Sequence, residues 1–174
     1  MLQGMPTVRL ERLSDAHVEE LERLAADPDV QRNTYVPEPP PPGFGCTWLE
    51  AYEKAREAGT REGFAIVDCD TGAFLGLAAA VHLDEDAGEA ELGYILAPEA
   101  RGRGAATEAL LQLTDWAFGR GLVRLELRID SGNDRSVRVA ERCGYTREGL
   151  LRSVHFKDGR RTDLLIYSRL PADP

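Results

Sequence analysis

The stretch from Glu91 to Thr107 has the sequence ELGYILAPEARGRGAAT and combines a strand, a glycine-rich loop and the start of a helix. The apolar and aromatic residues of its first part are typical of a strand, which Pro98 ends because proline has no N–H to donate to a ladder. The alanine- and leucine-rich run that begins at Ala105 favours a helix. Since the unpaired N–H groups and the dipole at a helix N-terminus attract anions, this stretch predicts an anion site.

The loop between this strand and this helix has the composition of a phosphate site. Gly102 and Gly104 allow the backbone to approach a ligand closely or to adopt positive φ, while Arg101 and Arg103 add charge suited to phosphate oxygens. The chain has no Gly-x-x-x-x-Gly-Lys motif, and its Gly-x-Gly lacks the third glycine of a dinucleotide fingerprint. We therefore expect a pyrophosphate on a loop of another kind.

Length and composition are those of a single globular domain. The 174 residues suffice for one domain, 1–174, with a substantial core. No apolar run reaches transmembrane length and no signal-peptide pattern is present, so we expect a soluble, cytoplasmic protein without a membrane partner. The three widely spaced cysteines fit neither a disulfide framework nor a zinc site, and we expect them to be reduced and structural. They are Cys46, Cys69 and Cys143.

The charge of the chain is unevenly distributed. The net charge of −9 argues against a nucleic-acid partner. Residues 1–100 hold 7 basic and 20 acidic side chains, whereas residues 101–174 hold 14 basic and 10 acidic ones. This asymmetry suits an enzyme with an anionic cofactor on one side and a cationic substrate on the other, although the same charges would also serve simply to solvate the surface.

Alternating apolar patterns and turn residues predict seven strands and four helices. The expected strands are residues 8–11, 64–68, 74–83, 89–96, 124–130, 145–155 and 162–170. The expected helices run from Ser14 or Asp15 to an interruption at Asp27-Pro28-Asp29, from 48 to 58, from 104 to 118 and from 133 to a C-terminal glycine at 144. A helix between two strands implies one parallel, right-handed crossover in an otherwise antiparallel sheet. The proline-rich residues 36–45 form a stiff loop, either a pocket wall or a surface connector.

The order of these elements and the residues of the glycine-rich loop together resemble the GNAT superfamily of N-acetyltransferases. The pyrophosphate motif of that superfamily is Arg or Gln, any two residues, Gly, any residue, then Gly or Ala, and it matches Arg101–Ala106. The C-terminal half is similar to the Rim-type branch, named for ribosomal-protein N-terminal acetyltransferases. The matching motifs are Glu91-Leu92-Gly93-Tyr94, Asn133-x-x-Ser136, Glu141-Arg142-Cys143-Gly144-Tyr145, Glu148-Gly149, Arg152, and Asp158-Gly159 through Asp163 to Tyr167. The N-terminal third matches only in its pattern of elements.

The resemblance implies both a fold and an activity. The fold is α+β, a mixed, mostly antiparallel seven-stranded sheet with a splayed parallel pair at its centre, flanked by about four helices. The activity is direct transfer of an acetyl group from acetyl-CoA to a primary amine, without a metal. We expect the acceptor to be the α-amine of a protein or peptide N-terminus. The alternatives are a small amine, such as an amino acid or antibiotic, and a non-catalytic acyl-CoA-binding regulatory module. A homodimer is one oligomeric state open to such a protein.

The resemblance also assigns acetyl-CoA to particular residues. The backbone of Ile95, Leu96 and Ala97 would pair with the pantetheine amides, and one of these N–H groups would polarise the thioester carbonyl. The pyrophosphate would lie on the loop and the first helical turn, at Arg101, Gly102, Arg103, Gly104, Ala105 and Ala106. Asn133 would cap its helix, contact the cofactor or do both.

Glu91 is the preferred general base, because it lies on the strand upstream of the acetyl end. Glu89 is the alternative if the register differs, since the two side chains share a face of the strand. An α-amine has a reference pKa near 7.7–8.0 and needs only modest help from one carboxylate. A solvated carboxylate without a catalytic role is the other interpretation of Glu91.

The general acid is less defined. Ser136 resembles the family residue that lies near the CoA sulfur and would protonate the departing thiolate, but a serine in a first helical turn has the same pattern. Other GNAT enzymes carry a tyrosine acid seven positions after the capping asparagine, where this chain has Ala140. The acid is therefore Ser136, Tyr167 or solvent. We expect His82 and His155 to be structural, with His155 a candidate for lining the acceptor channel.

Overall fold

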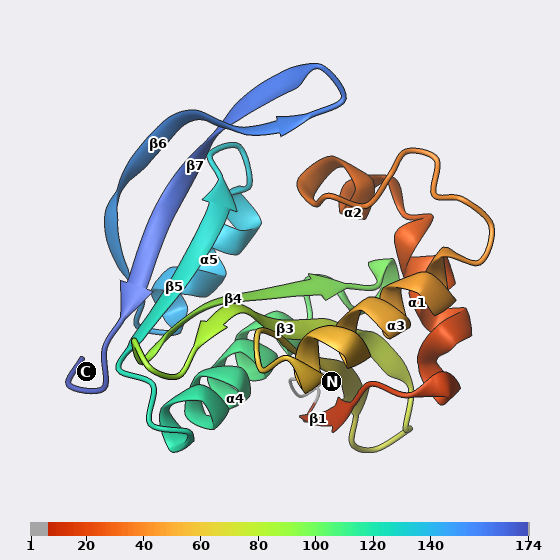
Figure 1. Cartoon of the computed structure of the whole chain (residues 1–174), viewed down its shortest axis with the longest axis horizontal. Coiled ribbons are helices and arrows are strands. Elements are labelled where there is room, and N and C mark those ends of the chain that lie inside the picture. The colour runs from red at the N-terminus through yellow and green to blue at the C-terminus, as the bar shows by residue number, and fades with distance from the viewer. Residues whose placement is uncertain (1–6, 174) are drawn as a thin grey trace, which may run out of the picture.

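The strand that precedes the glycine-rich loop is β4 (Glu89–Leu96), the middle strand of a seven-stranded sheet (Figure 1). The computed structural model describes residues 7–173. The remaining strands are β1 (Val8–Arg12), β2 (Glu62–Asp68), β3 (Phe74–Asp84), β5 (Arg124–Asp130), β6 (Thr146–Lys157) and β7 (Arg160–Arg169). Their order across the sheet is β1-β2-β3-β4-β5-β7-β6, which confirms the predicted seven-stranded α+β architecture.

β4 and β5 form the predicted parallel pair, and they soon separate. The pairing of Glu89–Glu91 with Arg124–Glu126 covers three residues on each strand, while the other neighbouring strands within residues 7–173 pair in antiparallel fashion. Beyond Glu91 one edge of the β4 backbone is no longer paired with β5, and Figure 1 shows the two strands diverging from this point. The splayed pair predicted from the resemblance is therefore present, and it opens the sheet at its centre.

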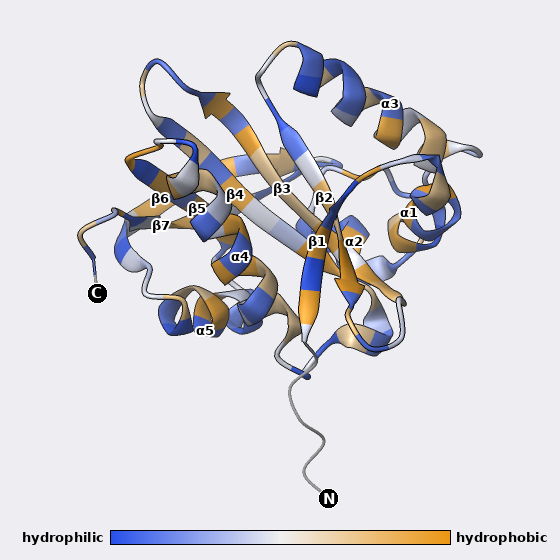
Figure 2. Cartoon of the chain, turned by 90° about the horizontal axis from the view of Figure 1, so that it is seen from below, coloured by the Kyte–Doolittle hydropathy of each residue, from blue (hydrophilic) through white to orange (hydrophobic). Residues whose placement is uncertain are grey.

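Helices cover both faces of the sheet. They are α1 (Val18–Ala25), α2 (Pro28–Asn33), α3 (Phe44–Glu57), α4 (Ala105–Gly119) and α5 (Asp134–Arg142). Figure 2 shows α4 and α5 on one face and α1 and α3 on the opposite face. The molecule has two hydrophobic cores. α4 buries Leu110 and Leu113 in one core, whereas α1 and α3 bury Leu21 and Leu49 in the other. Removal of these apolar side chains from water stabilises both helical layers. No helix within residues 7–173 is both long and apolar enough to cross a membrane.

The fold has one more helix than the sequence predicted. The Asp27-Pro28-Asp29 sequence was expected to interrupt a helix, and it does end α1, but it also begins α2. The Asp27 side chain accepts a hydrogen bond from the Val30 N–H at 3.0 Å, and Pro28 occupies the first helical position, where no N–H is needed. α3 also begins earlier than predicted, at Phe44 instead of Trp48.

The glycine-rich loop has the backbone geometry that its sequence suggested. Gly102 and Gly104 have φ angles of 73° and 90°, in the left-handed region that favours glycine. Gly104 is the N-cap of α4, so the first N–H groups of that helix face the space before it. The three cysteines are unpaired, with Cys143 buried and the other two exposed.

Candidate active site

A cavity of about 1390 Å³ lies where β4 and β5 separate. Its walls come from the separated part of β4, the glycine-rich loop, the first turn of α4, one side of α5 along its length and the whole of α2. β4, the loop and α4 follow one another in the sequence, whereas α2 and α5 come from other parts of the chain and meet them where the central strands diverge. The cavity therefore combines an open strand edge with the N-terminus of a helix.

The open edge of β4 presents fewer backbone groups than the sequence suggested. Ala97 was predicted to face pantetheine together with Ile95 and Leu96, but its N–H donates to the Leu75 carbonyl on the β3 side at 2.9 Å, and the residue is buried. Because successive residues of an antiparallel strand direct their N–H groups to opposite sides, the Leu96 N–H points away from β3, toward the cavity. Ile95 is in register with Leu77 of β3 and is one of the residues that line the cavity.

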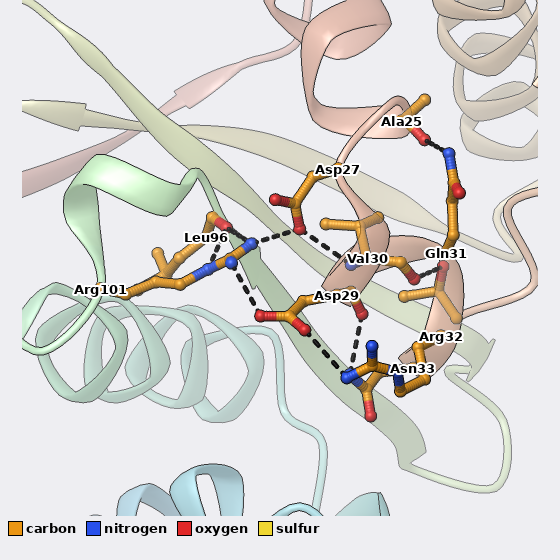
Figure 3. A network of polar contacts seen from close by, with 10 residues as sticks. Ala25, Asp27, Asp29, Val30, Gln31, Arg32, Asn33, Leu96 and Arg101 are labelled. Atoms are coloured by element: carbon orange, nitrogen blue, oxygen red, sulfur yellow. Dashed lines mark hydrogen bonds and ion pairs between the residues drawn. The ribbon is translucent and has the colours of Figure 1, made fainter.

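The guanidinium of Arg101 is engaged with the N-terminus of α2 (Figure 3). It donates to Asp27 at 2.6 Å, to Asp29 at 3.1 Å and, through two nitrogens, to the Leu96 carbonyl at 3.0 and 3.2 Å. Burial disfavours ionisation of Asp27, but the hydrogen bonds from Arg101 and Val30 outweigh it and lower the pKa of Asp27. Arg101 lines the large cavity, so a contact between this residue and a phosphate stays a prediction, but its guanidinium is already paired with two carboxylates.

The rest of the loop offers mainly backbone to an anion. Arg103 is exposed and, unlike Arg101, is not among the residues that line the cavity, so its contact with a phosphate stays a prediction. Gly102, Gly104 and Ala106 do line it, and Ala105 is the first residue of α4 with a fully buried side chain. Free N–H groups at a helix start remain the anion-binding feature of this loop.

A row of arginines on α5 adds positive charge to the large cavity. Arg135, Arg138 and Arg142 line the large cavity, and their spacing of three and four residues places them on one face of the helix. None of the three forms an ion pair with a carboxylate of residues 7–173. The helical spacing was visible in the sequence, although we did not predict these residues as part of the site.

Two hydroxyl groups meet at the start of α5. The Tyr94 hydroxyl donates to Ser136 Oγ at 3.3 Å, and the Ser136 N–H donates to the Asn133 side chain at 3.1 Å, so the predicted cap by Asn133 is present. Burial raises the pKa of Tyr94 to about 12. Tyr167, an alternative acid, is 2% exposed within the core and lines neither this cavity nor the one described next.

A second cavity, of about 350 Å³, adjoins the first across β4. Its floor contains mainly apolar side chains of β3 and α3: Tyr52, Leu77, Ala79 and Val81. Glu91 lines it, with a carboxylate oxygen 3.1 Å from His82 Nδ1 and 3.5 Å from Arg128 Nε. The Glu91 side chain is 23% exposed, whereas Glu89, the alternative base, lines neither cavity. Of the two candidate bases, Glu91 is therefore the one beside a pocket.

Several groups border both cavities. His155 lines both, as its predicted place in a channel requires, and its ring packs against Tyr35 with centroids 4.5 Å apart. Asn33 and Thr34, at the end of α2, and Tyr94 on β4 also line both. The central part of β4 thus separates a long, basic cavity from a smaller, mainly apolar one.

The site has a strand that splays beside a glycine-rich loop and a helix N-terminus. Comparison of the sequence with known protein families agrees with this geometry. The protein-family model for the acetyltransferase (GNAT) domain matches residues 7–146 of this chain. The chain belongs to the GNAT acetyltransferase family. It is an acyltransferase that uses acetyl-CoA, as the resemblance implied.

Relatives of this GNAT protein differ in their acceptors. The uncharacterised N-acetyltransferase p20 of Bacillus licheniformis is 27% identical over 165 residues, which are 94% of this chain and 92% of that protein. A spermidine N-acetyltransferase from Vibrio cholerae, solved with CoA and spermine, superimposes with a TM-score of 0.84 at 23% identity and covers 95% of this chain and 96% of its own. RimL, an α-N-acetyltransferase of ribosomal L7/L12 solved with CoA, also gives 0.84, at 20% identity and 94% coverage of both chains. At these identities the two structures confirm the fold.

Proposed function

We propose that this protein acetylates the α-amine of a peptide or protein N-terminus. The observation that carries the proposal is the position of Glu91, on the wall of a small, mainly apolar cavity that adjoins the larger basic one. A carboxylate at this junction is suited to receive a proton from an amine that enters from one side while the acetyl donor enters from the other.

The charges of the small cavity favour a single amine over a polyamine. Of the residues that line it, Glu91 and Asp130 carry carboxylates. Glu91 is already contacted by Arg128 and His82, and one oxygen of Asp130 accepts a hydrogen bond from the Gly132 N–H at 2.9 Å. A polyamine would bury several ammonium groups and would need a carboxylate for each, since an unpaired buried charge is costly. A peptide N-terminus has one amine there and offers an apolar first side chain to the floor.

The large cavity has the groups that acetyl-CoA requires. The N–H groups at the start of α4, from Gly104 to Ala106, would hold the pyrophosphate. The arginine row of α5 would pair with the phosphate of CoA that is not part of the pyrophosphate, because the planar guanidinium group matches the geometry of phosphate oxygens. The Leu96 N–H would face the pantetheine on its way toward the small cavity, and Asn133 lines the same large cavity.

The proton steps follow from the groups at the junction. The amine nitrogen attacks the thioester carbonyl carbon, the carbon–sulfur bond breaks, and Glu91 accepts a proton from the nitrogen, directly or through water. Ser136, supported by the Tyr94 hydroxyl, donates a hydrogen bond to the departing thiolate. Because the pKa of Tyr94 is about 12, its hydroxyl stays protonated near neutral pH and remains a donor.

The experiment is a comparison of acceptors by release of CoA thiol from acetyl-CoA. The panel contains a short peptide with a free N-terminus, the same peptide with a blocked N-terminus and one lysine, a free amino acid, and spermidine. We expect the free peptide to have the highest kcat/KM. Faster turnover of spermidine or of the free amino acid would assign a small-molecule acceptor. CoA binding without thiol release on any amine would instead indicate a regulatory module.

A further inference from the structure

We infer that Arg101 is a positioning residue for the acceptor side of the site: its side chain ties α2, a wall shared by both cavities, to the phosphate loop. This inference rests on the proposed function only where it concerns the acceptor. The family motif groups this arginine with the cofactor loop, yet its guanidinium lies against the element that borders the amine pocket.

The tie is made of several charge-assisted contacts. Arg101 uses three nitrogens to reach Asp27, Asp29 and the Leu96 carbonyl (Figure 3). The side chains of Arg101 and Asp27 are 23% and 11% exposed, so solvent screens their pairing less than that of a surface ion pair. Since the Leu96 carbonyl belongs to β4, the same guanidinium joins three elements: the open strand, the loop that follows it and the start of α2.

α2 depends on such ties for its position. It has six residues, of which Val30 and Gln31 are buried, and a helix this short is not stable alone. Its N-terminal end is held by Arg101. Its C-terminal end is held by Lys157, at the tip of the β6–β7 hairpin, which donates to the Gln31 carbonyl and, at 2.6 Å, to the Val36 carbonyl. α2 therefore spans between the phosphate loop and the hairpin.

The position of α2 bears on the amine and much less on the phosphates. Asn33, the last residue of α2, and Thr34, which follows it, line both cavities. The ring of the next residue, Tyr35, packs against His155. Loss of the Arg101 tie would leave Asp27 without its ion-pair partner, would leave Asp29 paired only with Arg32 of α2 itself, and would free this wall to move. The backbone N–H groups of the loop and the arginine row of α5 would still be available to CoA.

The experiment separates this role from a phosphate contact. Arg101→Gln removes the guanidinium, and Asp27→Asn removes the charge of its partner while keeping a residue that caps α2 equally well. The matched control is Arg120→Gln, which breaks an exposed pair with Glu85 outside both cavities. Acceptor KM and acetyl-CoA KM are measured by thiol release, CoA affinity by calorimetry, and hydrogen exchange at residues 28–33 by mass spectrometry.

We expect both variants to raise the acceptor KM about tenfold, the effect of one charge-assisted hydrogen bond, with CoA affinity within about threefold of the wild type. The double variant should lose no more than Arg101→Gln alone, because the two residues act through one contact. Exchange at residues 28–33 should be faster in both variants and unchanged in the control.

Two outcomes would overturn the inference. If Arg101→Gln weakens CoA binding more than acceptor binding while Asp27→Asn changes neither, the guanidinium serves the phosphates. If exchange at residues 28–33 is unaltered in both variants, the tie does not position α2. Calorimetry and exchange need no acceptor, so they decide the matter even if no amine is acetylated. Arg101→Lys, which keeps the charge without the planar fork, gives the same comparison if the glutamine variant does not fold.

Discussion

Glu91→Gln should slow acetylation far more at low pH than at high pH. The substitution removes the carboxylate and keeps the shape of the side chain. An α-amine with a pKa near 7.7–8.0 is roughly 1–2% neutral at pH 6 and above about 90% neutral at pH 9. Without a base the variant can use only the neutral fraction, so the ratio of wild-type to variant kcat/KM should be about 50- to 100-fold larger at pH 6 than at pH 9.

The structure predicts that this variant folds normally. Glu91 is 23% exposed, and its contacts with His82 and Arg128 span 3.1 and 3.5 Å. Pairs of this kind contribute about 0–1 kcal/mol to the free energy of unfolding. Gln also keeps an oxygen that can accept from Arg128, so the melting temperature should change by no more than a few degrees.

The assay is the initial rate of acetyl-peptide formation, followed by mass spectrometry between pH 6 and pH 9 at subsaturating peptide. Glu89→Gln is the matched control, because Glu89 is on the same strand and lines neither cavity. A wild-type to variant ratio that does not change with pH would refute the role of Glu91 as base. Equal effects in the two variants would point instead to a general effect of charge on this strand.

Three further predictions concern stability and reactivity. Gly76→Ala should lower the free energy of unfolding by about 3 kcal/mol or more, because a Cβ there would lie 2.1 Å from a β4 carbonyl oxygen. Gly149→Ala is the control, because its Cβ would lie in open space, and it should leave the melting temperature nearly unchanged. Cys143 should resist iodoacetamide in the native protein at pH 8 while the two exposed cysteines are labelled, since burial raises its pKa to about 11. Arg124 holds the pKa of Glu148 at about 2, below the ordinary 4.5, so the stabilisation is complete above pH 4.5 and is lost as the pH falls toward 2. Because Glu148 is 42% exposed, Glu148→Gln should cost only about 1 kcal/mol at pH 7 and nothing at pH 2 in urea unfolding.

Local chemistry made most of the fold readable from the sequence. β5 has the bounds that its alternating pattern gave, 124–130, and β4 those given by its composition and Pro98. The left-handed φ of the loop glycines was also expected. α2 was missed because Asp-Pro-Asp both ends one helix and begins another, and nothing local indicates that a six-residue helix will be held in place.

The parts of the site that the sequence did not reveal depend on contacts across the fold. Arg101 meets Asp27, 74 positions away, so its charge looked available to a phosphate when only the loop was considered. Tyr94 and Ser136 are 42 positions apart and meet because α5 packs beside the opened strand. His82 reaches Glu91 at an irregularity in the β3–β4 register, which the alternation of residues does not predict. Sequence patterns identify elements, whereas side-chain partners are set by how those elements pack.

We propose that this GNAT protein transfers the acetyl group to an α-amine at the junction of the two cavities. The most direct measurement is tandem mass spectrometry of the products formed from acetyl-CoA and an equimolar mixture of spermidine and a peptide that carries a free N-terminus and one internal lysine. We predict that the acetyl group appears first on the N-terminal residue of the peptide. Acetylated spermidine or acetyl-lysine as the first product would contradict the claim.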